Sequence, residues 1–466
     1  MKHLIVVLTF ILLFNTASLA YLEPSFRIKA LGEDFVGIIL DEYTDIYRNP
    51  AYLGQVQNYK ILGEYRKDGN ERLVAGSVLP IFNYAKVAIL GKGWNKDTRS
   101  VYERREVYYG GNYVYISESK SEGSGKAPLT NPGLIYSIGL GPNLNLGANF
   151  TYFEDKSKST GQGRSSNSTT DTTTGILRQM SISNYESHGV TSKKNIQFTA
   201  GAKFLMPTGL DMDLTLSFQH LNSENSYASN NYNQYETYDS VGNLTQSIRN
   251  SSVIEAATPD QEGNRYGIGL RVSKPFLSLD QLNLLLGFSF TDWDVSTRVI
   301  QNLFRNDTLM YSVNQIFNGD RENIDMVLKF GIESREIEKV KLYAGITNFL
   351  TWEKQAYPDS VPNPPASKFR TSFYKISLPI GIEYRPFKKI ALRYGALPNY
   401  VYTRTESVNP NTNSSLSIYS NKTMTLSYSI GAGLQVIKNL TLEGYVTKSG
   451  NLLTADNWMI GASYTF

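Results

Sequence analysis

Apolar and polar residues alternate along much of the chain, and this period of two constrains the fold more than any other feature of the sequence. From Met424 to Val436 the even positions are apolar or aromatic, and the odd positions are Thr, Ser, Gly or Gln. From Tyr374 to Tyr384 a row of Ile and Leu is bounded by Tyr at both ends. Successive side chains of a β-strand point to opposite faces. An apolar face bounded by aromatic residues is typical of a strand that crosses a membrane.

Such segments repeat about thirteen times from residue 134 onward. Besides the two above, they lie near 134–141, 144–153, 195–206, 210–220, 264–274, 281–293, 323–333, 340–350, 389–397, 440–447 and 457–466. Three weaker candidates precede them: Tyr59–Arg66, Leu73–Leu79 and Tyr84–Gly93. Bacterial single-chain barrels have an even number of strands. We therefore predict an all-β fold, a transmembrane antiparallel β-barrel of 14 strands if one of the three candidates counts and 16 if all do.

Short and long connections alternate between these segments. Gly141–Asn143 and Pro207–Gly209 are tight, whereas 156–193, 222–263 and 300–321 are long and polar. In outer-membrane barrels the short turns are periplasmic and the long loops extracellular. We therefore expect the three long segments to be extracellular loops.

Residues 1–20 have the features of a secretory signal peptide. Lys2 precedes an apolar run from Leu4 to Phe14, and the small residues Ser18 and Ala20 occupy the −3 and −1 positions of a cleavage site. The run is too short to span a bilayer as a helix. We expect cleavage near Ala20, an N-terminal segment at 21–57 and a barrel with long extracellular loops at 58–466.

The last strand is expected to carry an assembly signal. Trp458, Tyr464 and the terminal Phe466 share one face of an alternating segment. A terminal Phe on such a strand resembles the signal that barrel-assembly machinery recognises. We therefore expect this machinery and outer-membrane lipid as partners, and the bacterial outer membrane as the location.

The composition excludes several function classes. The chain has no Cys, which excludes disulfides and thiolate metal sites. It has 46 basic and 42 acidic residues, without a dense basic run, so we predict no nucleic-acid partner. Beyond the signal peptide His188 and His220 are the only histidines. We expect His188 in a loop rich in Ser and Asn and His220 at the outer end of an apolar row, so we predict no enzyme, no metal and no cofactor.

Charges of both signs occupy the polar faces of the predicted strands. They are Lys203, Asp211, Asp213, Arg265, Arg271, Asp325, Lys329, Glu333, Lys341, Lys375, Glu383 and Arg393. If Tyr384 pairs with Ile390, Glu383 is diagonal to Arg393 and within its reach. The simplest interpretation is that these charges neutralise one another in a wet lumen. The alternative is a lining that selects permeants, although mixed signs argue against selectivity for one sign of charge.

The segment 21–57 does not alternate, and it resembles a known family. Leu31-Gly32, the apolar stretch 35–40, Asp41, Asp45 and above all Asn49-Pro50-Ala51 followed by Leu53 are similar to the N-terminal region of the long-chain fatty acid transporter superfamily. That superfamily also includes barrel proteins of the type nine secretion system. The resemblance implies that this segment is a hatch inside the barrel, with Asn49, Pro50 and Ala51 as its motif.

Physical reasoning favours the same position for the segment over the alternative, a flexible periplasmic leader. Phe26, Phe35, Ile38, Ile39 and Leu53 need a place to be buried, and a barrel of 14 to 16 strands is wider than its own side chains fill. We expect a short helix over residues 41–47 that ends before Pro50, because the residue before a proline is disfavoured in the helical region. Asn49 should be buried.

Three functions remain open from the sequence. The first, which rests mainly on the resemblance, is passive uptake of small hydrophobic molecules that leave laterally through a gap in the wall. The second is a barrel that docks partners of a secretion system through its polar surface loops. The third is a general diffusion porin, which an occluded lumen would disfavour.

Overall fold

The structure is a computed structural model. It describes residues 25–465 except 57–59, 68–70, 83–84, 96, 111–112, 127–128, 277–278, 357–367, 409–414 and 450–456. The predicted signal peptide and Phe466 lie outside the described residues. In the described part of the chain no helix is long and apolar enough to cross a membrane.

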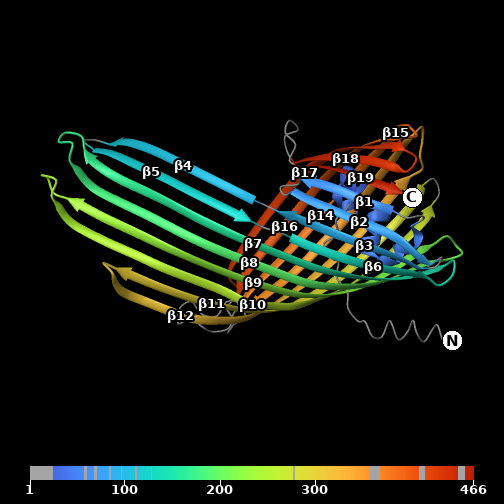
Figure 1. The fold of residues 1–466 in the computed structure, drawn as a ribbon, viewed down its shortest axis with the longest axis horizontal. Coiled ribbons are helices and arrows are strands. Elements are labelled where there is room, and N and C mark those ends of the chain that lie inside the picture. The colour runs from blue at the N-terminus through green and yellow to red at the C-terminus, as the bar shows by residue number, and fades with distance from the viewer. Residues whose placement is uncertain are drawn as a thin grey trace.

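The described residues form one antiparallel sheet and a small N-terminal helical segment (Figure 1). The helices are α2 (Phe26–Leu31), η1 (Glu33–Phe35), α3 (Glu42–Arg48) and η2 (Pro50–Gln55). The strands are β1 (Lys60–Lys67), β2 (Glu71–Phe82), β3 (Ala85–Asn95), β4 (Asp97–Gly110), β5 (Tyr113–Lys126), β6 (Leu129–Gly139), β7 (Leu144–Asp171), β8 (Leu177–Leu205), β9 (Asp211–Tyr238), β10 (Leu244–Phe276), β11 (Leu279–Arg305), β12 (Thr308–Ser334), β13 (Val340–Ala356), β14 (Lys368–Ser377), β15 (Ile380–Phe387), β16 (Ile390–Val408), β17 (Ser415–Ile437), β18 (Leu440–Ser449) and β19 (Asn457–Thr465).

The sheet closes into a ring because β1 pairs with β2 on one side and with β19 on the other. Three pairs of these 19 strands lie end to end, and each pair counts as one member of the ring. They are β3 with β4, β5 with β6, and β14 with β15, which both lie between β13 and β16. The described ring therefore has 16 members, the larger of the two predicted numbers, and all three weak N-terminal candidates are strands.

The outside of the ring is apolar. On β17 the even positions Met424, Ile430 and Leu434 are 81%, 60% and 45% exposed, whereas Ser429 between them is 5% exposed. The other strands repeat this arrangement, with small or polar residues turned inward. This is the register predicted for Met424–Val436. An apolar exterior on a closed sheet matches contact with lipid, because closure leaves no open edge strand in the ring.

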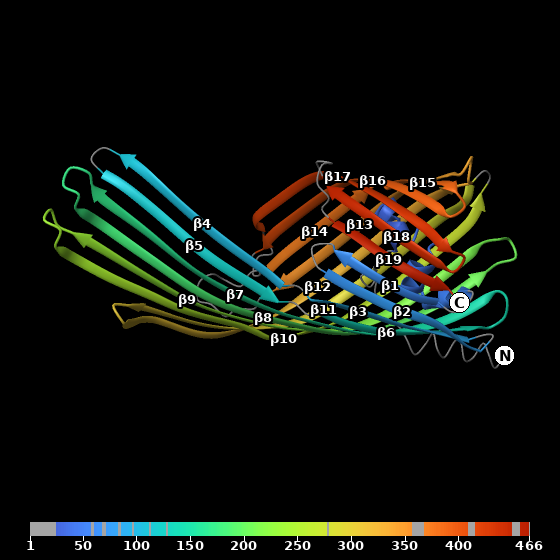
Figure 2. The same cartoon turned by 45° about the horizontal axis from the view of Figure 1, so that its top comes forward.

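The three segments predicted to be loops are strands instead. Residues 156–171, 177–193, 222–238, 244–262, 294–305 and 308–319 extend β7 to β12 far beyond the ring, and β4 and β5 join them at one edge. We call this part, β4, β5 and these outer parts of β7 to β12, the distal sheet; it projects to the left in Figures 1 and 2. Except on the edge strands β4 and β12, its Thr, Ser, Tyr and Asn residues have hydrogen-bonding neighbours on both sides, which stabilises strands without an apolar face.

The tight ends of the distal sheet explain why the loops are absent. At the β11–β12 connection Asn306 and Asp307 both have positive φ, at 48° and 62°. Two central residues with positive φ make the type of turn that matches the twist of a hairpin, and Asn and Asp tolerate it best after Gly. A two-residue turn leaves the flanking residues paired, so a segment that looks like a polar loop continues as strand.

Prolines interrupt the wall at two places. On β6, Thr130 pairs with Glu154 and Gly133 with Thr151, but Asn131 and Pro132 between them have no partner on β7. Leu378 and Pro379 separate β14 from β15. Proline cannot donate to a strand ladder. Between β14 and β15 the neighbouring strands still bond this segment, because Gly345 donates to the Pro379 carbonyl and Leu378 donates to that of Pro398. The site on β6 is therefore the weaker of the two.

Candidate functional site

The lumen of the ring contains the N-terminal segment from Ser25 to Val56, which we call the plug. Its two α-helices are short and capped by their own sequence. The Ser25 hydroxyl accepts from the backbone N–H of Ile28 at 3.2 Å, and the Asp41 carboxylate accepts from that of Thr44 at 3.0 Å. The helix α3 occupies the region where a helix was predicted. Such short helices are marginal alone, so contacts with the wall must supply most of the stability of the plug.

Asn49 joins the plug to the wall. It is fully buried between α3 and η2, and its side-chain oxygen accepts from the Ala51 N–H at 3.0 Å. Its amide nitrogen donates to the carbonyls of Ala202 on β8 and Leu214 on β9, both at 3.3 Å. One side chain therefore caps η2 and also bonds two wall strands, with Pro50 at the start of η2 where a missing N–H costs nothing.

Two glycines of the wall make room for this motif. A Cβ at Gly201 would lie 1.9 Å from Oδ1 of Asn49, and a Cβ at Gly147 would lie 2.3 Å from the carbonyl carbon of Pro50. Neither distance is compatible with a side chain. Glycine is required here because the plug backbone lies directly against the wall.

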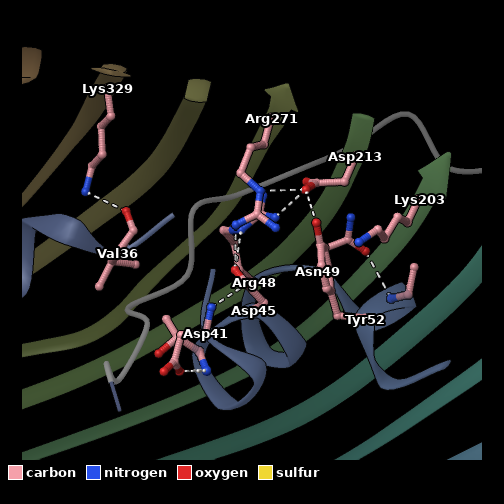
Figure 3. Close-up of polar contacts among 12 residues, drawn as sticks. Val36, Asp41, Asp45, Arg48, Asn49, Tyr52, Lys203, Asp213, Arg271 and Lys329 are labelled. Carbon is pink, nitrogen blue, oxygen red and sulfur yellow. Dashed lines mark hydrogen bonds and ion pairs between the residues drawn. The ribbon is translucent and has the colours of Figure 1, made fainter. Parts of the chain in front are cut away.

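A buried network of four charges fixes α3 to β9 and β10 (Figure 3). Arg271 donates to Asp45 of the plug and to Asp213 of β9, both at 2.8 Å. Arg48 of the plug donates to Asp213 at 2.6 Å and lies 3.6 Å from Asp45. Two cations and two anions balance one another, and all four side chains are at most 3% exposed.

Tyr52 completes this network from η2. Its hydroxyl donates to Asp213 at 2.8 Å, and its ring lies 4.8 Å from the guanidinium of Arg271 and 4.1 Å from the ammonium of Lys203. Lys203 in turn contacts Asp211 at 2.7 Å and the side chain of Gln55 at 2.9 Å. Burial raises the pKa of Tyr52 further above its usual value, so its hydroxyl stays a donor at physiological pH.

Lys329 and Lys375, both predicted lumen charges, hold the plug around η1. Lys329 donates to the carbonyls of Asp34 and Val36 at 3.2 and 3.1 Å, and Lys375 lies 2.8 Å from the Asp34 carboxylate. Burial alone raises the pKa of Asp34, but the two lysines outweigh it and hold that pKa below its usual value. The Asp34 carboxylate is therefore charged at neutral pH.

Glu383 and Arg393 form a third attachment with Arg27 of α2. Arg393 donates to Glu383 at 2.7 Å and to Glu443 at 2.7 Å, and Arg27 lies 3.5 Å from Glu383. The predicted contact between Glu383 and Arg393 is present, but the pairing behind it was wrong. A bulge after Tyr384 pairs that residue with Leu392, so Glu383 and Arg393 are directly opposite.

Lys341 and Glu333 lie next to this cluster, whereas Arg265 and Asp325 form a separate pair at 2.8 Å between β10 and β12. Lys341 contacts Glu333 at 2.5 Å and Asp280 at 2.6 Å, and Glu333 lies 4.0 Å from Arg27. Arg27 also donates to the Tyr343 hydroxyl at 2.8 Å. The wall charges thus neutralise one another only in part, because several of them pair with the plug.

Three apolar clusters complete the contact between plug and wall, and the smallest is Ala30 of α2 on Tyr445 of β18. In the first, Ile46, Tyr52, Leu53 and Val56 of the plug pack on Val78, Ala88 and Ile135 of β2, β3 and β6. In the second, Ile28, Leu31, Phe35, Ile38 and Ile39 pack on Leu285 and Tyr343 of β11 and β13. The apolar residues of the plug are therefore buried in the lumen, as the sequence analysis predicted; the side chain of Phe26 is outside the described residues.

Sequence reasoning missed the charges on the plug itself. Arg27, Asp34 and Arg48 were not singled out, although each pairs with a wall residue that was. The available signal was their presence in a segment otherwise expected to be buried, since a buried charge requires a partner. The predicted assembly residues Trp458 and Tyr464 lie on β19, whose pairing with β1 closes the ring.

Comparisons with known proteins give structural likeness only. No family model and no curated protein matches the chain. Among solved structures, the CymD monoaromatic hydrocarbon channel has 12% identity and a TM-score of 0.38, covering 97% of this chain and 99% of its own.

The toluene transporter TbuX of Ralstonia pickettii has 10% identity and a TM-score of 0.39, with coverage of 96% and 100%. A FadL homologue of Pseudomonas aeruginosa has 13% identity and a TM-score of 0.34, with coverage of 96% and 99%. At such values the likeness carries no inference about what this chain binds.

Proposed function

We propose that this protein is an outer-membrane β-barrel channel for passive uptake of small hydrophobic molecules, which pass the plug and leave laterally through the wall. One observation carries the proposal: an apolar cluster between plug and wall lies beside an interruption of that wall. Ile135 of the cluster is on β6, three residues from Pro132, where pairing with β7 is broken. A hydrophobic molecule would move from one apolar surface to lipid without crossing water.

The filled lumen disfavours a general porin. Three charged attachments and three apolar clusters hold the plug in the interior, and a lumen filled in this way is a poor aqueous path for hydrophilic solutes. A docking role remains the second candidate, and the projecting distal sheet favours it because it offers exposed surface unrelated to the lumen (Figure 2).

Cross-linking β6 to β7 tests the lateral path. The chain has no cysteine, so Asn131→Cys with Phe153→Cys introduces the only thiols, at opposite positions of the interruption. A control pair, Thr199→Cys with Ser217→Cys, joins β8 to β9 where the ladder is intact. Uptake of a radiolabelled long-chain fatty acid and of a small aromatic hydrocarbon is measured in cells that lack another channel for them.

We expect the oxidised Asn131/Phe153 variant to lose uptake of both probes and to regain it after reduction. The control pair should transport equally in both states. Full uptake through a cross-linked wall would contradict lateral release, and equal uptake by cells without the protein would contradict the channel function.

A further inference from the structure

The distal sheet contains a trough that no part of the uptake proposal uses. A hollow of about 540 Å³ crosses β5, β7, β8, β9 and β10. This volume is within the range of about 300 to 1,000 Å³ that small-molecule sites occupy. It lies beyond the ring, in the part of the molecule at the left of Figures 1 and 2.

Two adjacent cross-strand rows line the trough, and the first is polar throughout. Its members Lys120, Arg164, Asn184, Tyr232 and Ser251 are directly opposite one another in sequence across the five strands. With strands about 4.8 Å apart, the row is roughly 19 Å long. The trough therefore suits an elongated ligand that lies across the strands.

The second row runs beside the first. It consists of Glu122, Gln162, Glu186, Asn230 and Val253. Val253 is the one apolar member of either row. The two glutamates offset the lysine and arginine of the first row, so the ten side chains have no net charge.

Several of these side chains are free to bind a ligand. Among the described residues, the side chains of Gln162, Arg164, Asn184 and Asn230 have no hydrogen-bond partner or ion pair. Between them they offer amide donors, amide acceptors and a guanidinium fork. Tyr232 adds a ring whose hydroxyl donates to Gln234 at 2.8 Å.

From these observations we propose that the trough binds a neutral oligosaccharide chain, as carried by the outer-leaflet lipid around the barrel. The neighbouring hydroxyl groups of a sugar both donate and accept hydrogen bonds, so they match the amides and the charges of both signs in the trough. The apolar face of a sugar ring can also pack on the ring of Tyr232. An extended peptide fits less well. The five strands already pair on both sides, so no backbone ladder is open, and the trough has no apolar pocket for side chains.

The position of the trough supports the lipid as the source. Asn184 and Glu186 are on the same side of β8 as Ile196 and Phe204, which are exposed on the outside of the ring. The trough thus continues the lipid-facing side of the wall past its end. The proposal that the sugar belongs to the outer-leaflet lipid rests on the proposed outer-membrane location. The proposal that the trough binds a sugar does not.

The test uses the purified full-length mature protein on a glycan array. The array carries neutral and acidic oligosaccharides, polysaccharide chains released from lipopolysaccharide, and unrelated neutral glucans. The double variant Arg164→Ala/Asn184→Ala removes two free groups of the first row. The matched control Ser165→Ala/Ser183→Ala changes the next residues along the same strands, on the opposite face. Heat-modifiable migration checks folding of each variant.

We expect binding to neutral chains from lipopolysaccharide, at least tenfold weaker in the double variant because two hydrogen-bonding groups are lost, and unchanged in the control. Binding only to unrelated glucans would overturn the lipid source. Binding to no sugar, binding only to acidic sugars, or equal loss in both variants would overturn the site. Hydrocarbon uptake is measured in parallel, so failure of the proposed channel function can be distinguished from failure of the proposed sugar site.

Discussion

The ring and the distal sheet are built from the same strands but are stabilised in different ways. Along β8, Thr199 and Lys203 are buried in the ring between the plug and an apolar exterior, whereas Glu186 and His188 further out are exposed on a sheet with water on both faces. The ring therefore depends on buried charges, close backbone contacts and lipid. The distal sheet depends on its hydrogen-bonded ladders and cross-strand pairs. A period of two in the sequence thus predicts strands. Whether lipid, the plug or water contacts a strand depends on whether each of its two faces is apolar or polar.

Arg271→Met should have the largest effect on stability. Asp45 and Asp213 would keep only Arg48 as a cationic partner inside a dry contact, and breaking a buried charge pair typically costs about 3 to 5 kcal/mol. The matched change in the distal sheet, Arg164→Met, should change the free energy of unfolding by less than about 0.5 kcal/mol. Urea unfolding in lipid vesicles measures both. Equal costs would remove the distinction between the two regions.

Ile430→Arg should have the second largest effect. It places a charge on the lipid face near the middle of the apolar row, which costs roughly 2 to 4 kcal/mol in a barrel. Val190→Arg, on the exposed surface of the distal sheet, should be close to neutral. The same unfolding assay decides, and a tolerated arginine at 430 would show that the even face of β17 does not face lipid.

Gly201→Ala should displace the plug while the ring stays folded. The new methyl would overlap Asn49, and overpacking of this kind costs about 1 to 3 kcal/mol. Gly269→Ala is the control, since its Cβ would meet nothing closer than 3.7 Å. Conductance in planar bilayers should rise for the first variant only. An unchanged conductance for Gly201→Ala would mean that the motif tolerates a displaced Asn49.

Acidification should have the smallest effect of the four. Lys329 and Lys375 lower the pKa of Asp34 in the folded protein. The stability that the Asp34 ion pairs contribute is therefore fully present above pH about 3.9, the ordinary pKa of Asp, and is lost as the pH falls through the lowered pKa. Conductance should therefore rise in this acid window. Asp34→Asn should lack that step, and an identical pH profile for the variant would assign the rise to other carboxylates.

The sequence predicted the ring well because its physical signals are local. Apolar rows such as Met424–Val436 identify strands and their outward faces, and Pro50 marks the end of α3. The distal sheet was missed because Ser, Thr and Asn suit both loops and strands, and only pairing with distant partners decides between them. Arg27, Asp34 and Arg48 were missed for a related reason: their partners on the wall lie at least 165 residues away in sequence, and no local pattern identifies them.

The central claim is that the plug closes the ring, and deletion of residues 21–48 from the mature protein tests it most directly. This removes the helices α2 and α3 with the charges at 27, 34, 45 and 48, and leaves every described strand of the ring intact. Folding is checked by heat-modifiable migration, and single-channel conductance is measured in planar bilayers. We predict a folded barrel that conducts ions much better than the intact protein. A folded deletion variant with unchanged conductance would contradict the claim.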